Sequence, residues 1–407
     1  MKNNIWVLGA GPGDPSYVTP IVTSILKNAH CVVVAKRHLS LAKNHKNIIY
    51  LENFDDTTKS IIKEIEIGDV AVLVSGDPGI YSLLQYLKSK FPSEQIKILP
   101  GISSLQTLAA AAKETWNDSV ILSGHGKEIK NSKILDTIDK NRSTYFFCGK
   151  DKNPKWLCKL LAENEFNNIK VTIGENLSYP NEKITCGQPC ELKDDYDTLS
   201  LVLIINDTPN KRHNNRPKDE EFIRAEVPMT REEVRSVIID KMELETDSLV
   251  WDIGAGTGSI SIASALLCTD GEVHAVEYNP TAVELEIKNI KKFGLFNVFT
   301  HTGTALDTIK TLKKPTHVFI GGSGKELQEI LEYIPNLGEN IKIVITGVTL
   351  KTNAIAYTIL NTPNYKEFDA IQINISRAKK IAESTIMSAQ NPITIFSAIT
   401  NKTKEGL

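Results

Sequence analysis

Glycines and one carboxylate in the second half of the chain have the spacing of a nucleotide-type binding loop. Gly254, Gly256 and Gly258 follow the apolar run 249–253 and precede a helical pattern, and Glu277 stands at the end of the next apolar run. Glycine lets the backbone approach a ligand, and the N-terminus of the following helix offers free N–H groups. A carboxylate at the second strand end can accept hydrogen bonds from both hydroxyls of a ribose. The pattern therefore predicts a cofactor that contains a nucleoside.

Two cofactor classes fit this loop, a dinucleotide and S-adenosylmethionine. The dinucleotide fingerprint requires a third glycine where this chain has Ser259. Asp252, just before the loop, is unfavourable beside a pyrophosphate but suits the ammonium group of a sulfonium ligand. These two residues favour S-adenosylmethionine, and a purely structural turn is the alternative explanation of the glycines.

Three more glycine-rich segments follow apolar runs in the first half of the chain. They span residues 9–14, 76–79 and 101–104, after the predicted strands 5–8, 70–74 and 96–99. Pro12 removes an N–H donor where a phosphate would need one, and the run 31–35 leads into Lys36, Arg37 and His38 rather than into an acid, so a dinucleotide site is unfavourable here. Loops at the carboxyl ends of parallel strands meet at one edge of a sheet. We therefore expect the three loops to line one cleft, unless they are simple tight turns.

The elements that must position these loops alternate between strand and helix patterns, which predicts an α/β fold with two separate domains. The stretch 206–221 has no large apolar residue, so it cannot offset the entropy of ordering itself. We expect domains at 1–207 and 219–407, joined by a linker at 208–218. The first domain should contain a second α/β lobe at about 118–205, and the second domain a parallel, doubly wound sheet.

Helix signals in the second domain are specific. Thr230 is predicted to cap a helix, with Glu233 reaching back to it, and Asn279 with Pro280 to start another. The buried stripe of the second of these helices is predicted at Val283, Ile287, Ile290 and Phe293. Further strands are predicted at 272–276, 297–301, 316–320, 341–346, 370–376 and 393–399.

The composition is that of an ordinary globular protein, with 407 residues, a formal net charge of −2, 41% hydrophobic and 24% charged residues. The lack of a basic excess argues against a nucleic-acid partner. The apolar run 5–8 is too short for a signal-peptide core, and no run reaches the roughly 18 apolar residues of a membrane span, so we expect a cytoplasmic protein. The six cysteines lack a CxxC pair, which predicts free thiols rather than a zinc site.

The motifs of the first half resemble those of the tetrapyrrole methyltransferases. The segments VLGAGPGDPSYVT at 7–19, VSGDPGIYS at 74–82 and ILPGISSLQ at 98–106 carry the likeness, and GENLSYP at 174–180 resembles the branch that methylates carbon 5 of the corrin precursor. The second half resembles the Rossmann-type methyltransferases that act at carbon 15 and decarboxylate the acetate at carbon 12. Its matching segments are VPMTREEVR at 227–235, WDIGAGTGSISI at 251–262, EYNPTAVE at 277–284, IGGSG at 320–324, ISRAK at 375–379 and MSAQNP at 387–392. The two halves in this order are similar to the fused precorrin methyltransferases of cobalamin biosynthesis.

The resemblance implies one S-adenosylmethionine site per domain. The first half would adopt the two-lobed tetrapyrrole methylase fold (a class III methyltransferase), and the second a Rossmann-like class I methyltransferase fold. In the first domain the implied cofactor residues are Pro12, Gly76, Asp77, Ser103, Ser104 and Cys148. In the second they are Thr230, Gly254, Ala255, Gly256, Thr257, Gly258, Glu277 and Ala305.

One segment departs from the family pattern. Where the family usually has an acid in its GDA segment, this chain has Gly303, Thr304 and Ala305. We therefore expect weaker cofactor affinity in the second domain. A Thr304→Asp variant with unchanged affinity would contradict that expectation.

Methyl transfer from a sulfonium is an in-line displacement, so the protein mainly aligns the reactants, and we expect neither a metal nor a catalytic triad. His125 is a candidate for positioning substrate or moving a proton, although a lone histidine is more often structural. Gly321, Gly322 and Ser323 end the fourth strand of the second domain, where the methyl acceptor would lie. Substrate carboxylates are expected on Arg37, Arg231, Arg235 and Arg377, with solvated surface charge as the alternative.

The substrate implied by the resemblance is precorrin-6B, methylated at carbons 5 and 15 and decarboxylated to precorrin-8, and its metal-free and cobalt forms fit equally. The resemblance also suggests a homo-oligomer formed through the second domain. Three alternatives are a fused methyltransferase acting on RNA or protein, a nicotinamide-dependent oxidoreductase and a non-catalytic scaffold. The balanced charge disfavours RNA, Ser259 disfavours the oxidoreductase, and the intact cofactor loops disfavour the scaffold.

Overall fold

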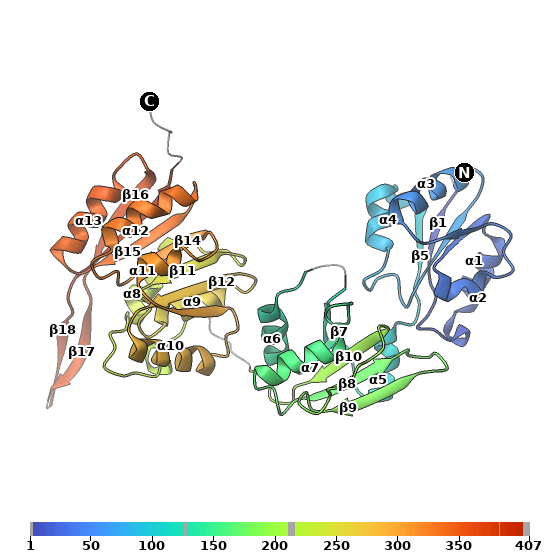
Figure 1. The fold of residues 1–407 in the computed structure, drawn as a ribbon, viewed down its shortest axis with the longest axis horizontal. Coiled ribbons are helices and arrows are strands. Elements are labelled where there is room, and N and C mark those ends of the chain that lie inside the picture. Colours follow the sequence, from blue (N-terminus) through green and yellow to red (C-terminus); the bar gives the residue numbers. More distant parts are fainter. Residues whose placement is uncertain (1–2, 126–127, 211–215, 382, 402–407) are drawn as a thin grey trace. The chain divides into compact units, whose positions relative to one another are not determined.

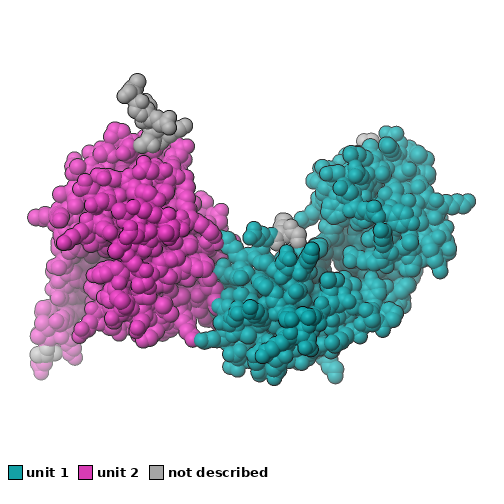
Figure 2. Space-filling view, in the orientation of Figure 1, with its two compact units in different colours: residues 1–209 teal, residues 210–407 magenta. Residues whose placement is uncertain are grey.

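The computed structural model describes residues 3–125, 128–210, 216–381 and 383–401. The chain divides into two compact units, Met1–Pro209 and Asn210–Leu407, which Figure 2 shows in different colours. Residues 211–215 of the predicted linker and Gly126 beside His125 lie outside the described residues. Within the described parts, every helix falls short of the length and apolar character that a membrane crossing requires.

The first lobe of unit 1 is a parallel sheet of order β3-β2-β4-β1-β5 (Figure 1). Its strands are β1 (Ile5–Gly9), β2 (Cys31–Val34), β3 (Ile48–Tyr50), β4 (Val70–Val74) and β5 (Ile96–Leu99). Its helices are η1 (Pro15–Tyr17), α1 (Pro20–Asn28), η2 (Lys36–His38), α2 (Leu39–Ala42), α3 (Phe54–Glu64), α4 (Leu84–Lys90) and η3 (Ser93–Gln95). Every residue of β4 is buried, as a parallel sheet covered on both faces requires. Because β4, β1 and β5 are neighbours, the loops that follow them meet at one edge.

The second lobe of unit 1 is a mixed sheet of order β6-β7-β10-β8-β9, parallel only between β6 and β7. Its strands are β6 (Val120–Ser123), β7 (Ser143–Phe147), β8 (Lys170–Glu175), β9 (Lys183–Gly187) and β10 (Ser200–Ile205). Its helices are α5 (Ser104–Ala112), α6 (Asn131–Lys140) and α7 (Pro154–Glu163). Ser103 and Gln106 form a capping box that starts α5, whose Leu105 and Leu108 pack with Leu203 of β10.

Unit 2 is a seven-stranded sheet of order β13-β12-β11-β14-β15-β19-β16. Its strands are β11 (Leu249–Ile253), β12 (Glu272–Glu277), β13 (Val298–Thr302), β14 (His317–Ile320), β15 (Lys342–Gly347), β16 (Tyr365–Ile373) and β19 (Ile393–Thr400). Its helices are η4 (Asp219–Glu221), α8 (Glu232–Met242), α9 (Ser259–Leu267), α10 (Pro280–Lys292), α11 (Ala305–Ile309), α12 (Leu327–Tyr333), η5 (Ile334–Leu337) and α13 (Leu350–Leu360). One apolar cluster packs α8 and α9 against the sheet, and another packs α12 and α13, so both faces are covered.

The predicted parallel sheet holds for the first five strands of unit 2 and for the direction of β16, and it is wrong for β19. β19 pairs antiparallel with both β15 and β16. No crossover helix separates β16 from β19 in the described residues, because the chain between them forms the hairpin β17 (Ser376–Ile381) and β18 (Ser384–Ala389). A chain that returns without a crossover can only pair antiparallel. The two motifs at 375–379 and 387–392 lie on this hairpin, which the sequence analysis did not predict.

The predicted capping box at the start of α8 is also wrong. The N-cap is Arg231, and no side chain caps the helix. Glu233 instead binds the guanidinium of Arg377, and the carbonyl of Thr230 accepts a hydrogen bond from Arg235 at 2.7 Å. The Glu233 carboxylate, which the local pattern assigned to the cap, therefore pairs with an arginine far away in the sequence.

The buried stripe of α10 is turned from the predicted one. Asn279 does cap the helix, accepting a hydrogen bond from the N–H of Thr281, but Ile287 is 51% exposed while Glu286 is 0% exposed. Asn289 explains the rotation, because its side chain donates to the Thr257 carbonyl and accepts from the Ile223 N–H. Hydrogen bonds from one buried amide thus fix which face of α10 points inward.

Glu286 is an unusual result of that rotation. In the described structure neither of its carboxyl oxygens has a hydrogen-bond partner. Burial, with smaller contributions from Asp252 and Glu277, raises the pKa of Glu286 to about 9. The side chain is therefore a neutral acid at neutral pH, enclosed without compensation for its polar atoms.

A Glu286→Gln variant should be more stable than the parent, by an amount that grows with pH. The pKa of Glu286 is raised in the folded state from 4.5 to about 9, so its contribution to stability is complete below the lower value and is lost as pH rises towards the upper one. The advantage of glutamine should grow by up to about 4 kcal/mol between about pH 5 and about pH 8. Hydrogen exchange of β11 and β12 peptides in urea would measure it.

Glu284→Gln is the matched control for that measurement, because Glu284 is exposed on the same helix. Its stability should follow the parent at both pH values. An advantage of Glu286→Gln that does not change with pH would contradict the burial of an uncharged acid at this position.

Candidate functional site

The loops after β11 and β14 meet main chain to main chain in unit 2. Gly254, Gly256 and Gly258 all have positive φ, at 78°, 58° and 76°. A Cβ placed on Gly254 would overlap the carbonyl of Gly322. Only glycine satisfies both the conformation and the contact at position 254. The result is a floor without side chains at the carboxyl end of the sheet.

Glu277 ends β12 beside this floor and is held rigidly. Its Oε1 accepts from the N–H groups of Tyr278 and Asn279 at 2.9 Å each, and its Oε2 accepts from the N–H of Gly256 at 3.0 Å. A carboxylate has about four acceptor positions, so about one is left for a ligand hydroxyl. The backbone thus fixes the carboxylate that the sequence predicted at the strand end.

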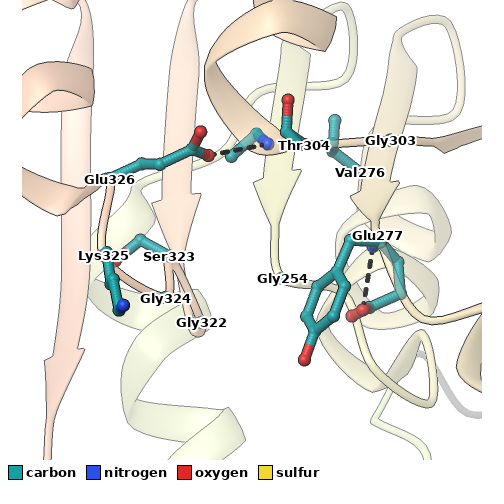
Figure 3. A pocket seen from close by; sticks show the side chains of 12 residues that line it. Gly254, Val276, Glu277, Gly303, Thr304, Gly322, Ser323, Gly324, Lys325 and Glu326 are labelled. Atoms are coloured by element: carbon teal, nitrogen blue, oxygen red, sulfur yellow. Dashed lines mark hydrogen bonds between the residues drawn. The ribbon is translucent and has the colours of Figure 1, made fainter.

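The pocket of unit 2 is lined by segments that follow β11, β12, β13 and β14 (Figure 3). Five predicted site residues line it: Gly254, Glu277, Ala305, Gly322 and Ser323. Six other residues predicted for the cofactor or the methyl acceptor do not: Thr230, Ala255, Gly256, Thr257, Gly258 and Gly321. The glycines at 256 and 258 shape the turn into α9, and Thr257 is buried within it. Tyr278, Lys325 and Glu326 line the pocket without having been predicted.

Asp252 does not lie where a ligand's ammonium group could reach it. The side chain is fully buried and accepts a hydrogen bond from the hydroxyl of Ser261. Burial raises the pKa of Asp252 to about 6. The sequence interpretation of this acid is therefore wrong, because the alternation of β11 turns its side chain under α9 and away from the pocket.

The three arginines predicted for substrate in unit 2 lie in an ion cluster around Asp219. Arg235 is only 2% exposed and binds Asp219 and the carbonyls of Pro217 and Thr230. Arg231 lies 3.5 Å from the same Asp219, and Arg377 pairs with Glu232 and Glu233. Burial makes the Arg235 guanidinium unavailable to a solvent-borne carboxylate. Arg231 and Arg377 are 44% and 38% exposed, so a substrate contact of these two stays a prediction. The cluster joins η4, α8 and the base of the β17–β18 hairpin.

The three glycine loops of unit 1 meet as predicted. Gly11 and Gly76 form a β-bridge, and a Cβ on Gly101 would overlap the carbonyl of Gly76. Asp77 ties the loops together, since its Oδ2 accepts from the N–H of Gly101 at 3.0 Å and its Oδ1 from the N–H of Gly79 at 2.7 Å. The edge of the first sheet is therefore one continuous main-chain surface.

A pocket lined by both lobes of unit 1 contains every site residue predicted there. These are Pro12, Arg37, Gly76, Asp77, Ser103, Ser104, His125 and Cys148. The second lobe contributes further residues that include Phe147 and Leu177. Burial raises the pKa of the Cys148 thiol, which is therefore uncharged. Figure 2 shows unit 1 hollowed between its lobes.

The three side chains of Lys36–His38 lie in three different environments. Lys36 pairs with Glu52 at 3.3 Å, Arg37 lines the pocket, and His38 is only 3% exposed. Burial, aided by the charge of Arg37, lowers the pKa of His38 to about 4, so the ring is neutral.

The partner of that neutral ring was not predicted from the sequence. His38 Nε2 lies 2.7 Å from the hydroxyl of Ser75, which lines the pocket. The imidazole therefore orients a pocket hydroxyl. The sequence feature that could have identified Ser75 as a pocket residue is its place directly before the second glycine loop.

Two family models match the chain. The one described as Tetrapyrrole (Corrin/Porphyrin) Methylases matches residues 4–191, and the one described as Precorrin methyltransferase domain matches residues 221–400. Each model thus covers most of one compact unit.

Individual relatives match about half of the chain each. A probable cobalt-precorrin-6B C(15)-methyltransferase (decarboxylating) of Pyrobaculum aerophilum is 36% identical over 184 residues, 44% of this chain and 93% of that protein. A probable cobalt-precorrin-7 C(5)-methyltransferase of Methanocaldococcus jannaschii is 35% identical over 210 residues, 50% of this chain and 98% of that protein. A crystal structure of a precorrin-6Y C5,15-methyltransferase from Geobacter metallireducens shares 34% identity, covers 45% of this chain and 97% of that one, and has a TM-score of 0.43.

Alanine should destabilise unit 2 strongly at Gly254 and hardly at all at Gly322, although the two glycines touch. At Gly254 the Cβ would overlap the Gly322 carbonyl at a positive φ, so unit 2 should lose at least about 3 kcal/mol. At Gly322 the nearest atom is 3.8 Å away, so Gly322→Ala should stay within about 0.5 kcal/mol of the parent. Urea unfolding followed by hydrogen exchange of β11 would compare them, and equal losses would argue against this contact.

Proposed function

The chain belongs to the tetrapyrrole and precorrin methyltransferases, and on that premise we propose that it methylates precorrin-6B, or its cobalt form, at carbons 5 and 15. Unit 1 is assigned the reaction at carbon 5. Unit 2 is assigned the reaction at carbon 15 and the decarboxylation of the carbon-12 acetate. The observation that carries the proposal is that each unit has its own pocket at the carboxyl ends of parallel strands.

The unit 2 pocket fits S-adenosylmethionine. The cofactor supplies a methyl group on a sulfonium, which is already activated for displacement. Glu277 has an acceptor position left for a ribose hydroxyl, and the glycine floor at Gly254 leaves room for close approach. Ala305 and Val276 offer apolar surface beside them. These residues bind and align, which is the main requirement of an in-line displacement.

The unit 1 pocket fits the same cofactor with different residues. Asp77 fixes the loops around Gly76 and Gly101, and Ser103 caps the N-terminus of α5 beside them. Pro12 and Ser104 complete this side, and Cys148 faces it from the second lobe as a neutral thiol. In this pocket, too, the residues would bind and align the cofactor.

One cation lines each pocket and suits a substrate rich in acetate and propionate groups. Among the described residues, Arg37 is the one arginine or lysine lining the unit 1 pocket, and Lys325 is the one lining the unit 2 pocket. Either can pair with a substrate carboxylate. Gly322 leaves the unit 2 entrance open to a bulky macrocycle. The electron pair released by decarboxylation can enter the conjugated ring system, so no Schiff-base lysine is required.

The test is to incubate the purified chain with S-adenosylmethionine and precorrin-6B, with and without cobalt, and to weigh the product. The expected product gains two methyl groups and loses one carbon dioxide. The form that reacts identifies the natural substrate. No reaction with either form would refute the tetrapyrrole substrate and favour an RNA or protein acceptor.

A Gly322→Leu variant should separate the two reactions. The added side chain would fill the unit 2 entrance, so methylation at carbon 15 and carbon dioxide release should fall at least about 100-fold. Binding of S-adenosylhomocysteine by unit 1 of the same molecule should be unchanged and serves as the internal control. Normal carbon dioxide release from this variant would move the acceptor to another part of the pocket.

A further inference from the structure

Glu326 reaches across the unit 2 pocket from the loop before α12. Its Oε2 accepts hydrogen bonds from the N–H groups of Ala305 at 3.0 Å and Leu306 at 3.3 Å, at the start of α11. Figure 3 draws the first of these bonds as a dashed line from Glu326. The carboxylate therefore joins the loop after β14 to the loop after β13. The proposed function assigns no role to this side chain.

Glu326 and Glu277 differ in how many of their carboxylate oxygens accept backbone hydrogen bonds. Both backbone donors bind Oε2 of Glu326, and Oε1 has no hydrogen bond to any described residue. At Glu277, by contrast, both oxygens are engaged by the main chain. An acceptor-only group held in place with one oxygen unused is a binding element for a donor on the ligand.

Among the described residues, the other carboxylate near the 303–306 loop, that of Asp307, is not available to a ligand. Asp307 accepts a hydrogen bond from the hydroxyl of Thr304 at 2.8 Å and does not line the pocket. Thr304 lines the pocket with its hydroxyl proton already donated. Glu326 is therefore the acidic group at this end of the pocket.

Strand order places a nucleobase near Glu326. The sheet runs β13-β12-β11, so the pocket passes from the glycine loop, past Glu277, to the loop after β13. With the ribose at Glu277, the base extends towards Ala305, between the walls formed by Val276 and Tyr278. The exocyclic amino group of adenine is a hydrogen-bond donor on the outer edge of the base, whereas hypoxanthine has an acceptor oxygen there.

We infer that Oε1 of Glu326 accepts a hydrogen bond from the adenine amino group and thereby selects adenine over hypoxanthine in the unit 2 cofactor. This inference rests on the proposed function of that pocket. It also supplies the carboxylate that the GTA segment lacks, from a different loop. Replacing the amino group by a carbonyl would place two acceptors face to face, which weakens binding.

The test compares S-adenosylhomocysteine with S-inosylhomocysteine on the full chain. Hydrogen exchange of peptides covering 254–258 and 303–309 reports binding at unit 2 separately from unit 1. The parent should bind the adenosyl ligand at least about tenfold more tightly than the inosyl ligand. In Glu326→Gln that ratio should fall below about threefold, because the amide NH2 group that then faces the base can donate to hypoxanthine but cannot accept from adenine.

Glu326→Gln keeps a carbonyl oxygen for the Ala305 and Leu306 N–H groups, and Glu329→Gln, exposed on α12, is the matched loss of charge. Glu329→Gln should keep the parental ratio. If Glu326 only supports the loop, both ligands weaken in parallel and an unchanged ratio overturns the inference. Equal binding of the two ligands by the parent overturns it without any variant. Absence of adenosyl protection in parental unit 2 would refute the proposed cofactor site itself.

Discussion

Direct contact between main chains at strand ends is the constraint on which both pockets depend. In unit 2 the loops after β11 and β14 meet at Gly254 and Gly322, and in unit 1 the loops after β1, β4 and β5 meet at Gly9, Gly76 and Gly101. Parallel neighbours bring these loops within reach, and a Cβ at Gly254, Gly9 or Gly101 would force them apart. Two unrelated sheets thus reach the same result, a ligand floor made of peptide groups whose position is set by the sheet rather than by side-chain rotamers.

Main-chain donors also hold the acidic side chains in place. Asp77, Glu277 and Glu326 each accept at least two backbone N–H groups, which fixes their carboxylates without any basic side chain. The few cations that line the pockets remain available for an anionic ligand. Where basic side chains do pair with acids in unit 2, around Asp219, they join elements far apart in sequence and lie outside the pocket.

Patterns of residues close together in the sequence correctly predicted the features that depend only on neighbouring residues. The strands, the three loops of unit 1 and the position of Glu277 follow from apolar runs that end in glycine or an acid. The errors concern long-range partners. Arg235 was assigned to substrate although it is buried against Asp219. The buried face of α10 was mispredicted because Asn289 binds the backbone of two other segments. Glu326 carries no local signal at all, since its partners are backbone groups about twenty residues away.

The unpaired acid at position 286 limits how far unit 2 can change by mutation. Enclosing a polar group without partners consumes part of a stability margin of only about 5–15 kcal/mol. Substitutions elsewhere in unit 2 therefore start nearer the threshold at which folding fails. A destabilising substitution elsewhere in unit 2 should be tolerated when position 286 is apolar and should prevent folding more readily when it is glutamate. The residue at position 286 therefore changes the stability effect of substitutions at neighbouring sites. At Gly258, where an added Cβ would contact the Glu286 side chain, the changes in unfolding free energy will not be additive.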